Sequence, residues 1–189
     1  FSADRFRTYQ AAMLEAALPL DISYTYGNRL RGYFRQGEDS QDTLATVIER
    51  LRRDPESRRG YVSLWDSAYD LPITDERTAG VPCLVTLFFR LSAGRLTLTA
   101  TYRSHNLLTA WLQNIYGLTG IQSYVAGELG LPVGPLSVVS HSLGIDPRNS
   151  RYELARSISE TWNRDEDVDR TTGKHTLRED PHGYFIVTV

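Results

Sequence analysis

The residues of this sequence whose types and spacing suit chemistry are a cysteine and an arginine–serine pair. Cys83, the only cysteine, follows a proline, and Arg103-Ser104 stands twenty residues further on. The pair lies where an alternating strand pattern gives way to a helical one. At such a junction, backbone N–H groups and the helix dipole help an arginine to bind phosphate. A thiolate adds to electron-poor carbons, and a nearby arginine helps a thiol to ionise near neutral pH. We therefore expect a nucleophile beside an anion site.

Each candidate also has a purely structural interpretation. A lone cysteine such as Cys83 is most often a small buried hydrophobic residue. Paired arginines such as Arg58-Arg59 most often mark a solvated helix end, and an asparagine in a helix, such as Asn114, is most often exposed or capping. The chemical interpretation therefore requires that these residues meet in one site.

The composition bounds the class of protein. The 189 residues suffice for one domain with a real core, and 21 basic and 23 acidic residues give a net charge of −2. This near balance indicates neither nucleic-acid nor membrane binding. A single cysteine excludes an intramolecular disulfide and favours the cytoplasm, and no apolar run reaches the roughly 20 residues that cross a bilayer. The chain begins with Phe1 and not with methionine, which leaves open that upstream residues were removed.

The elements that must position these residues follow from hydrophobic periodicity. Strands 84–91 and 95–102 predict a hairpin around Ala93-Gly94, with Cys83 and Arg103 at its open end. The other predicted helices cover 1–18 (ended by Pro19), the stretch from a cap at Ser40 to Asp54-Pro55, 107–129 as one helix or two, and 152–162. The other predicted strands cover 57–65, 136–140 and 184–189. We expect extended and then irregular chain over 21–31, a loop over 66–81, and a loop or partly disordered chain over 163–181.

Several segments resemble thymidylate synthase, the folate-dependent family that methylates uracil nucleotides at C5. The segments are Tyr26-Gly27 followed by Arg31, the run DPESRRGYVSLWD over 54–66, Pro82-Cys83, Arg103-Ser104, and Asn114 at the family's distance from Arg103. The resemblance covers roughly residues 21–145. It implies an α+β fold with a twisted, mostly antiparallel or mixed sheet that packs on its twin in a homodimer, with helices on the other face.

The resemblance also implies a role for each matching residue. Cys83 would be the nucleophile that adds to C6 of the pyrimidine, Arg103 would touch both Cys83 and the nucleotide phosphate, and Tyr26 would stand near the proton-transfer network. Arg58, Arg59 and Ser104 would bind phosphate, with the arginine pair reaching into the neighbouring subunit's site. His141 would hold the sugar 3′-hydroxyl, and Asn106 occupies the position that binds the folate pterin.

Asn114 carries the prediction about the base. A carboxamide offers an acceptor to uracil N3–H and a donor to O4, a pairing that cytosine does not match. By resemblance, family members that act on cytosine nucleotides carry aspartate at this position. Asn114 therefore favours a uracil nucleotide.

The sequence departs from the family pattern at several positions. Asn106 replaces an aspartate, Leu30 replaces a tryptophan, and Leu143 replaces a tyrosine of the sugar pocket, which leaves ribose and deoxyribose both open. Asp180-Pro181-His182-Gly183 resembles the family's C-terminal Asp-Pro-His-Pro segment. The family segment that carries the catalytic glutamate has no match in this chain.

The sequence thus predicts one domain over residues 1–189 and a cytoplasmic homodimeric enzyme. Its substrates would be a uracil nucleotide monophosphate, dUMP or UMP, and 5,10-methylenetetrahydrofolate, and the product would be methylated at C5. The alternatives are a pyrimidine C5-hydroxymethylase and a non-catalytic nucleotide-binding relative.

Overall fold

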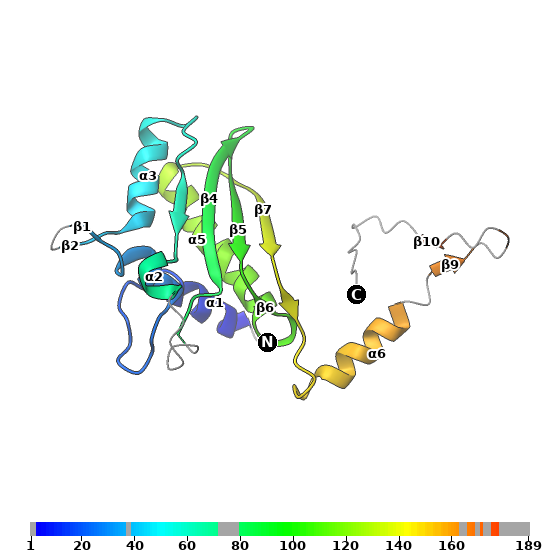
Figure 1. Ribbon diagram of the computed structural model, residues 1–189. Helices are drawn as coiled ribbons and strands as arrows, with labels where there is room; N and C mark the ends of the chain where they lie inside the picture. The colour runs from blue at the N-terminus through cyan, green and yellow to red at the C-terminus, as the bar shows by residue number, and fades with distance from the viewer. Residues whose placement is uncertain are drawn as a thin grey trace. The chain divides into compact units, whose positions relative to one another are not determined.

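A mixed β-sheet is the frame that positions the candidate residues (Figure 1). The computed structural model describes residues 3–36, 39–71, 80–162, 166–168, 171 and 175–177. The chain divides into two compact units, residues 1–145 and 146–189, and each is described here by itself. The prediction of one domain over the whole chain stays a prediction.

The sheet of the first unit has the strand order β3-β4-β5-β7. Its strands are β3 (Tyr61–Ser63), β4 (Leu84–Ser92), β5 (Arg95–Tyr102) and β7 (Val133–Ser140). β3 with β4 and β4 with β5 pair antiparallel, whereas β5 and β7 pair parallel. The predicted α+β class with a mixed sheet is confirmed. Packing against a second copy stays a prediction.

The predicted hairpin is confirmed as β4 and β5, which pair from Leu84 with Tyr102 to Ser92 with Arg95. Both residues of its tight turn have positive φ, 49° at Ala93 and 71° at Gly94. Such turns match the right-handed twist of paired strands, which is why two residues suffice to reverse the chain. The hairpin brings the segment before Leu84 beside the segment after Tyr102.

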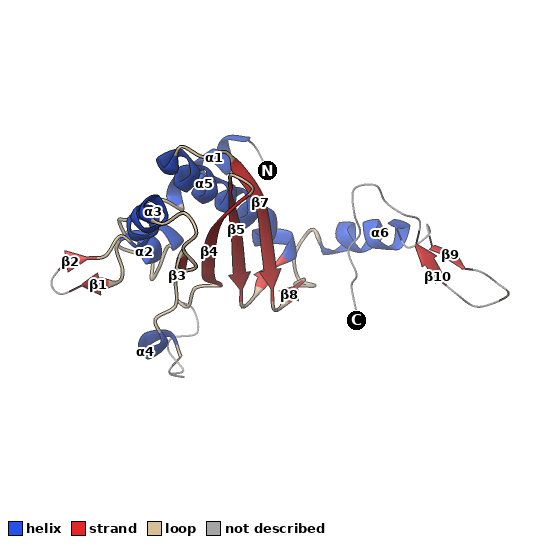
Figure 2. Cartoon of the chain, turned by 90° about the horizontal axis from the view of Figure 1, so that it is seen from above, coloured by secondary structure: helices blue, strands red, loops and turns tan. Residues whose placement is uncertain are grey.

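The helices α1 (Ala3–Ala12), α3 (Thr43–Arg53) and α5 (Leu112–Leu129) lie on one face of the sheet (Figure 2). The predicted apolar face of α3 is confirmed, because its buried residues are Leu44, Val47, Ile48 and Leu51. These side chains pack with the inward side chains of β5, which are Leu96, Leu98, Ala100 and Tyr102, each at most 1% exposed. The alternation along β5 thus separates a buried face from a face of threonines.

The predicted cap of α3 at Ser40 is wrong. The cap is Asp42, whose carboxylate accepts a hydrogen bond from the backbone N–H of Ala45 at 2.9 Å. Ser40 instead belongs to β2 (Asp39–Ser40), which pairs with β1 (Arg35–Gln36). The predicted end before Pro55 is confirmed, since Asp54 caps the helix.

The first predicted helix ends at Ala12 and not at Pro19. Side chains from α2 (Tyr26–Arg31) bind the backbone carbonyl oxygens of the segment that follows α1. Asn28 donates to the oxygen of Ala16 at 2.8 Å, and Arg31 donates to that of Leu14 at 3.1 Å. These oxygens therefore do not need partners within a longer helix. α2 itself corrects the prediction of extended and irregular chain, and Thr25 caps it.

The predicted helical stretch 107–129 begins with a π-helical turn, η1 (Leu107–Trp111), and continues as α5 until Gly130, whose φ of 67° ends it. Gly117, inside α5, lies where α1 packs, and a Cβ there would overlap the sulfur of Met13. The glycine therefore permits the close approach of α1 that places Tyr9 near the start of α5.

The remaining short elements of this unit differ in part from expectation. The loop predicted at 66–81 contains α4 (Ser67–Asp70), and the strand predicted at 57–65 narrows to β3. β6 (His105–Asn106) and β8 (Leu143–Gly144) form a parallel pair beside the main sheet. Among the residues described, no helix combines the length and the apolar character that a membrane span requires.

The second unit holds α6 (Tyr152–Trp162), which confirms the predicted helix. It also contains the antiparallel pair β9 (Glu166–Val168) and β10 (His175–Leu177), where loop was predicted. Period-2 alternation is weak in these polar segments, so periodicity did not reveal them. The predicted strand 184–189 and the segment Asp180–Gly183 lie outside the described residues.

Candidate active site

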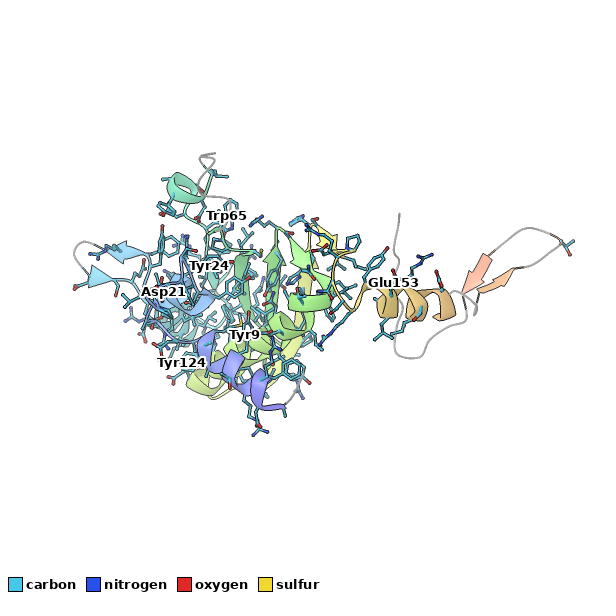
Figure 3. All side chains as sticks on the ribbon, turned by 90° about the horizontal axis from the view of Figure 1, so that it is seen from below. Tyr9, Asp21, Tyr24, Trp65, Tyr124 and Glu153 are labelled. Atoms are coloured by element: carbon cyan, nitrogen blue, oxygen red, sulfur yellow. The ribbon has the colours of Figure 1, made fainter. Side chains whose placement is uncertain are left out.

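A cavity of about 490 Å³ in the first unit brings together five of the nine predicted site residues: Tyr26, Cys83, Ser104, Asn106 and Asn114. They come from α2, the residue before β4, the segment between β5 and η1, and α5. The hairpin accounts for part of this convergence, because it places the start of β4 beside the end of β5. α1 and the chain before α2 supply further lining residues, including Tyr9 and Tyr24 (Figure 3).

Cys83 is half-buried and packs against the core at the start of β4. Its carbonyl oxygen accepts a hydrogen bond from the backbone N–H of Arg103 at 2.9 Å, so the two residues are neighbours across the hairpin, as predicted. The thiol lines the cavity and forms no disulfide. Cys83 is therefore held by backbone pairing at the wall of the cavity.

The guanidinium of Arg103 binds the segment that precedes Cys83. Its Nε donates to the carbonyl oxygen of Pro82 at 3.0 Å and its Nη2 to that of Val81 at 3.1 Å. It also lies 5.8 Å from the ring of Trp65, whose indole N–H donates to the oxygen of Pro82 as well. Arg103 is exposed and outside the cavity lining, so its positive charge stands beside the cysteine segment at the solvent side.

Four tyrosines surround the cysteine, and sequence reasoning singled out only Tyr26. The ring of Tyr26 lies 5.9 Å from that of Tyr24 and 6.4 Å from that of Tyr102. Tyr24 interacts with Tyr26 and with the backbone of Cys83, and both interactions partly offset the effect of burial on its pKa. Burial raises the pKa of Tyr9, Tyr24, Tyr26 and Tyr102, so all four phenols stay protonated at neutral pH and can donate hydrogen bonds. The alternation in Tyr24-Thr25-Tyr26 was the one sequence signal for Tyr24.

Asn114 is buried, 4% exposed, and both ends of its amide have partners. The hydroxyl of Tyr9 donates to Oδ1 at 2.6 Å, and Nδ2 lies 3.0 Å from Nε2 of His105. Nδ1 of His105 lies 2.7 Å from the hydroxyl of Ser140. His105 is 2% exposed, and burial lowers its pKa to about 4, so the imidazole is neutral at physiological pH. Tyr9 and His105 are site residues that sequence reasoning missed.

The other predicted residues fall into two groups. Asn106 lines the cavity, but its Oδ1 also accepts hydrogen bonds from the backbone N–H groups of Leu108 and Thr109 and so caps η1. Arg58, Arg59 and His141 are exposed and lie outside the cavity lining. The structure of one chain therefore unites the predicted nucleophile and the predicted base-reading residue but does not bring the arginine pair to them.

No cluster of three or more histidine, cysteine, aspartate or glutamate side chains that could hold a metal ion occurs within the described ranges. The side chains that line the cavity supply a thiol, phenols, two amides and an imidazole. This donor set can add a sulfur nucleophile to a bound ring and bind its polar edge.

Comparison with known proteins gives a consistent result. The profile of the thymidylate synthase family matches residues 8–146. A protein of Methanothermobacter marburgensis named "Putative thymidylate synthase" is 41% identical over 135 residues, which are 71% of this chain and 55% of that protein. Proteins of the same name from Methanosarcina acetivorans and Methanopyrus kandleri are 32% and 35% identical over 142 and 133 residues, 75% and 70% of this chain and 61% and 58% of theirs. The chain spans between half and two thirds of the length of these relatives.

Proposed function

The chain belongs to the thymidylate synthase family, and from this premise we propose that the protein transfers a one-carbon unit to C5 of a uracil nucleotide. The observation that carries the proposal is that Cys83 and Asn114, 31 residues apart in sequence, line the same cavity. A nucleophile and an amide in one cavity supply the two kinds of group that a pyrimidine ring needs if it is to be attacked at C6 and held at N3 and O4.

The chemistry proposed for Cys83 makes C5 reactive. The thiolate forms a bond to C6, and the electron pair of the C5–C6 double bond moves to C5 and toward O4. Asn114 Nδ2 would donate a hydrogen bond to O4 and so stabilise the negative charge that develops there. The phenols of Tyr24 and Tyr26 line the same cavity as Cys83 and, because they are protonated, can supply hydrogen-bond donors.

The lining of the cavity also supports the proposed cofactor, 5,10-methylenetetrahydrofolate. Asn106 retains its amide N–H₂ as a donor, since only its Oδ1 caps η1, and Ile22 and Tyr24 line the same cavity with aliphatic and aromatic surface. An amide beside such surfaces suits a flat, polar-edged ring. When bound, the folate would supply the one-carbon unit and its reducing equivalents.

We propose that the phosphate site is completed in a homodimer. Ser104 lines the cavity of its own chain, whereas Arg58 and Arg59 are exposed outside it. In the first unit the sheet face opposite the helices carries the in-register row Tyr61, Phe88, Thr99 and Ser137, and Tyr61 is 51% exposed. Two such faces packed together would bury this row and bring each arginine pair to the other subunit.

Subunit mixing tests the shared site. Arg59→Ala and Cys83→Ser proteins should each be inactive, but a mixture should regain activity, because one site of the heterodimer then has a native cysteine and a native partner arginine. The measurement is turnover after subunit exchange, with heterodimers verified by native mass spectrometry. The matched control mixes Arg59→Ala with the Arg59→Ala/Cys83→Ser double variant, which should stay inactive. Heterodimers without activity would show that each site is built from one chain.

Base preference tests the proposed substrate. With methylenetetrahydrofolate present, we expect tritium release from C5-labelled UMP or dUMP to exceed that from CMP or dCMP by at least about tenfold in kcat/KM, because a mismatched buried amide leaves polar groups unpaired. Asn114→Asp should narrow or reverse the preference. The assay uses the complete gene product. Equal or faster release from the cytosine pair would contradict the uracil assignment, and no release from any of the four would contradict the enzymatic proposal.

A further inference from the structure

We infer that Tyr9 is a specificity-determining positioning residue, which locks the orientation of the Asn114 amide through a directed hydrogen-bond chain that ends at Ser140. The inference rests on the proposed function in that Asn114 reads the base. It goes beyond that function in assigning the choice of amide orientation to residues that do not themselves need to contact the base.

The hydrogen-bond chain runs through four side chains, which come from four elements of the fold. Tyr9 on α1 reaches Oδ1 of Asn114 at 2.6 Å, Nδ2 of Asn114 reaches Nε2 of His105 at 3.0 Å, and Nδ1 of His105 reaches Oγ of Ser140 at 2.7 Å. All three distances lie within the range of good hydrogen bonds. The Asn114 amide is thus held at both ends and has little freedom to rotate.

The direction of the chain follows from donor chemistry. An amide nitrogen only donates, so Nε2 of His105 must accept. A neutral imidazole then carries its proton on Nδ1 and donates it to the hydroxyl of Ser140. The neutral state agrees with burial, which lowers the pKa of His105 to about 4. The ring of Tyr102, stacked on the imidazole at 3.7 Å, holds the imidazole plane.

A flipped amide would require every bond in the chain to reverse. Ser140 would donate to Nδ1, Nε2 would donate to Oδ1, and Nδ2 would donate to the Tyr9 hydroxyl. The proton of Tyr9 would then lose its acceptor, because Asn114 Oδ1 is the one hydrogen-bond partner of that hydroxyl among the described residues. Burial raises the pKa of Tyr9, so the proton cannot simply leave. Tyr9 is therefore the member of the hydrogen-bond chain that prevents the bonds from reversing their direction.

The locked orientation selects uracil. In Asn114, Oδ1 keeps one lone pair and Nδ2 keeps one proton that the hydrogen-bond chain does not use. The lone pair suits the N3–H donor of uracil, and the proton suits its O4 acceptor. Cytosine presents an acceptor at N3 and a donor at N4 and would need the flipped amide. Without the Tyr9 hydroxyl, a proton shift on His105 and a rotation of the Ser140 hydroxyl would suffice for the flip. The Tyr9 hydroxyl should thus matter more for cytosine rejection than for uracil turnover.

The test compares Tyr9→Phe with Tyr116→Phe in the complete gene product. Tyr116 is the matched control, since it lies on α5 and stacks on Phe6 of α1 at 4.0 Å but does not line the cavity. We expect Tyr9→Phe to reduce the UMP-over-CMP ratio of kcat/KM about tenfold, mainly by improving CMP, and Tyr116→Phe to leave the ratio unchanged. An unchanged ratio in a folded Tyr9→Phe protein would overturn the inference.

A second readout is independent of turnover. Imidazole ¹⁵N chemical shifts should show His105 protonated at Nδ1 in the unmutated protein and mixed between Nδ1 and Nε2 in Tyr9→Phe; a His105→Gln variant assigns the signal among the four histidines. A proton at Nε2 in the unmutated protein would overturn the inference. If no nucleotide is turned over, the proposed function fails. The ¹⁵N chemical shifts of His105 and calorimetric binding of UMP and CMP still decide whether Tyr9 sets the orientation of the Asn114 amide.

Discussion

Cys83→Ser should abolish turnover, by at least about a thousandfold, while nucleotide binding changes by less than about tenfold. The serine hydroxyl is nearly isosteric with the thiol but is far less ionised at neutral pH, so the bond to C6 does not form. Affinity should survive because the sulfur bonds to the base only during reaction and the phosphate and base contacts are elsewhere. The segment itself should keep its place, since the backbone pair between Cys83 and Arg103 does not involve the side chain.

The measurements are tritium release from C5-labelled uracil nucleotide and calorimetric binding of the same nucleotide. Cys83→Ala should match Cys83→Ser, which shows that loss of the nucleophile and not the added hydroxyl is responsible. Tyr116→Phe serves as the control for a folded variant outside the cavity. Turnover by the serine protein within tenfold of the unmutated protein would remove Cys83 from the mechanism.

Asp70→Ala should destabilise the fold by about 3–5 kcal/mol, because it leaves the buried guanidinium of Arg29 without its counter-charge. The two side chains are 2% and 0% exposed and meet in two hydrogen bonds of 2.9 and 2.8 Å. Arg29 also lies over the ring of Tyr33 at 3.8 Å and donates to the carbonyl oxygen of Leu64. The pair ties α4 to α2, the helix that also contains the cavity residue Tyr26.

Urea denaturation of the complete gene product measures this effect. Glu49→Ala is the matched control, because Glu49 pairs with Arg52 and Arg53 on the exposed side of α3, and it should leave the urea midpoint nearly unchanged. The double variant Arg29→Met/Asp70→Leu should recover part of the loss, since it removes both buried charges. A midpoint for Asp70→Ala that matches the control would show that the pair contributes little.

What the sequence determined by itself is local in the chain. The turn residues Ala93-Gly94 and the alternation of the two flanking strands predict the hairpin, and its register brings Cys83 beside Arg103. The apolar spacing in Thr43–Arg53 predicts the buried face of α3. Resemblance over short motifs then identified Tyr26, Ser104 and Asn114, and the structure places all three at one cavity with Cys83.

The tertiary structure alone decided how those residues are held. The end of α1 depends on side chains of α2 that bind carbonyl oxygens of the segment that follows α1, and no pattern within residues 1–18 encodes those partners. The bond between Tyr9 and Asn114 joins residues 105 positions apart and depends on the packing of α1 against α5, where the Tyr9 ring lies close to Gly117. The neutral state of His105 is set by burial, which depends on how the whole chain packs around it. Short motifs can therefore name the groups proposed to perform the chemistry, whereas their orientation and protonation come from contacts that only the folded chain creates.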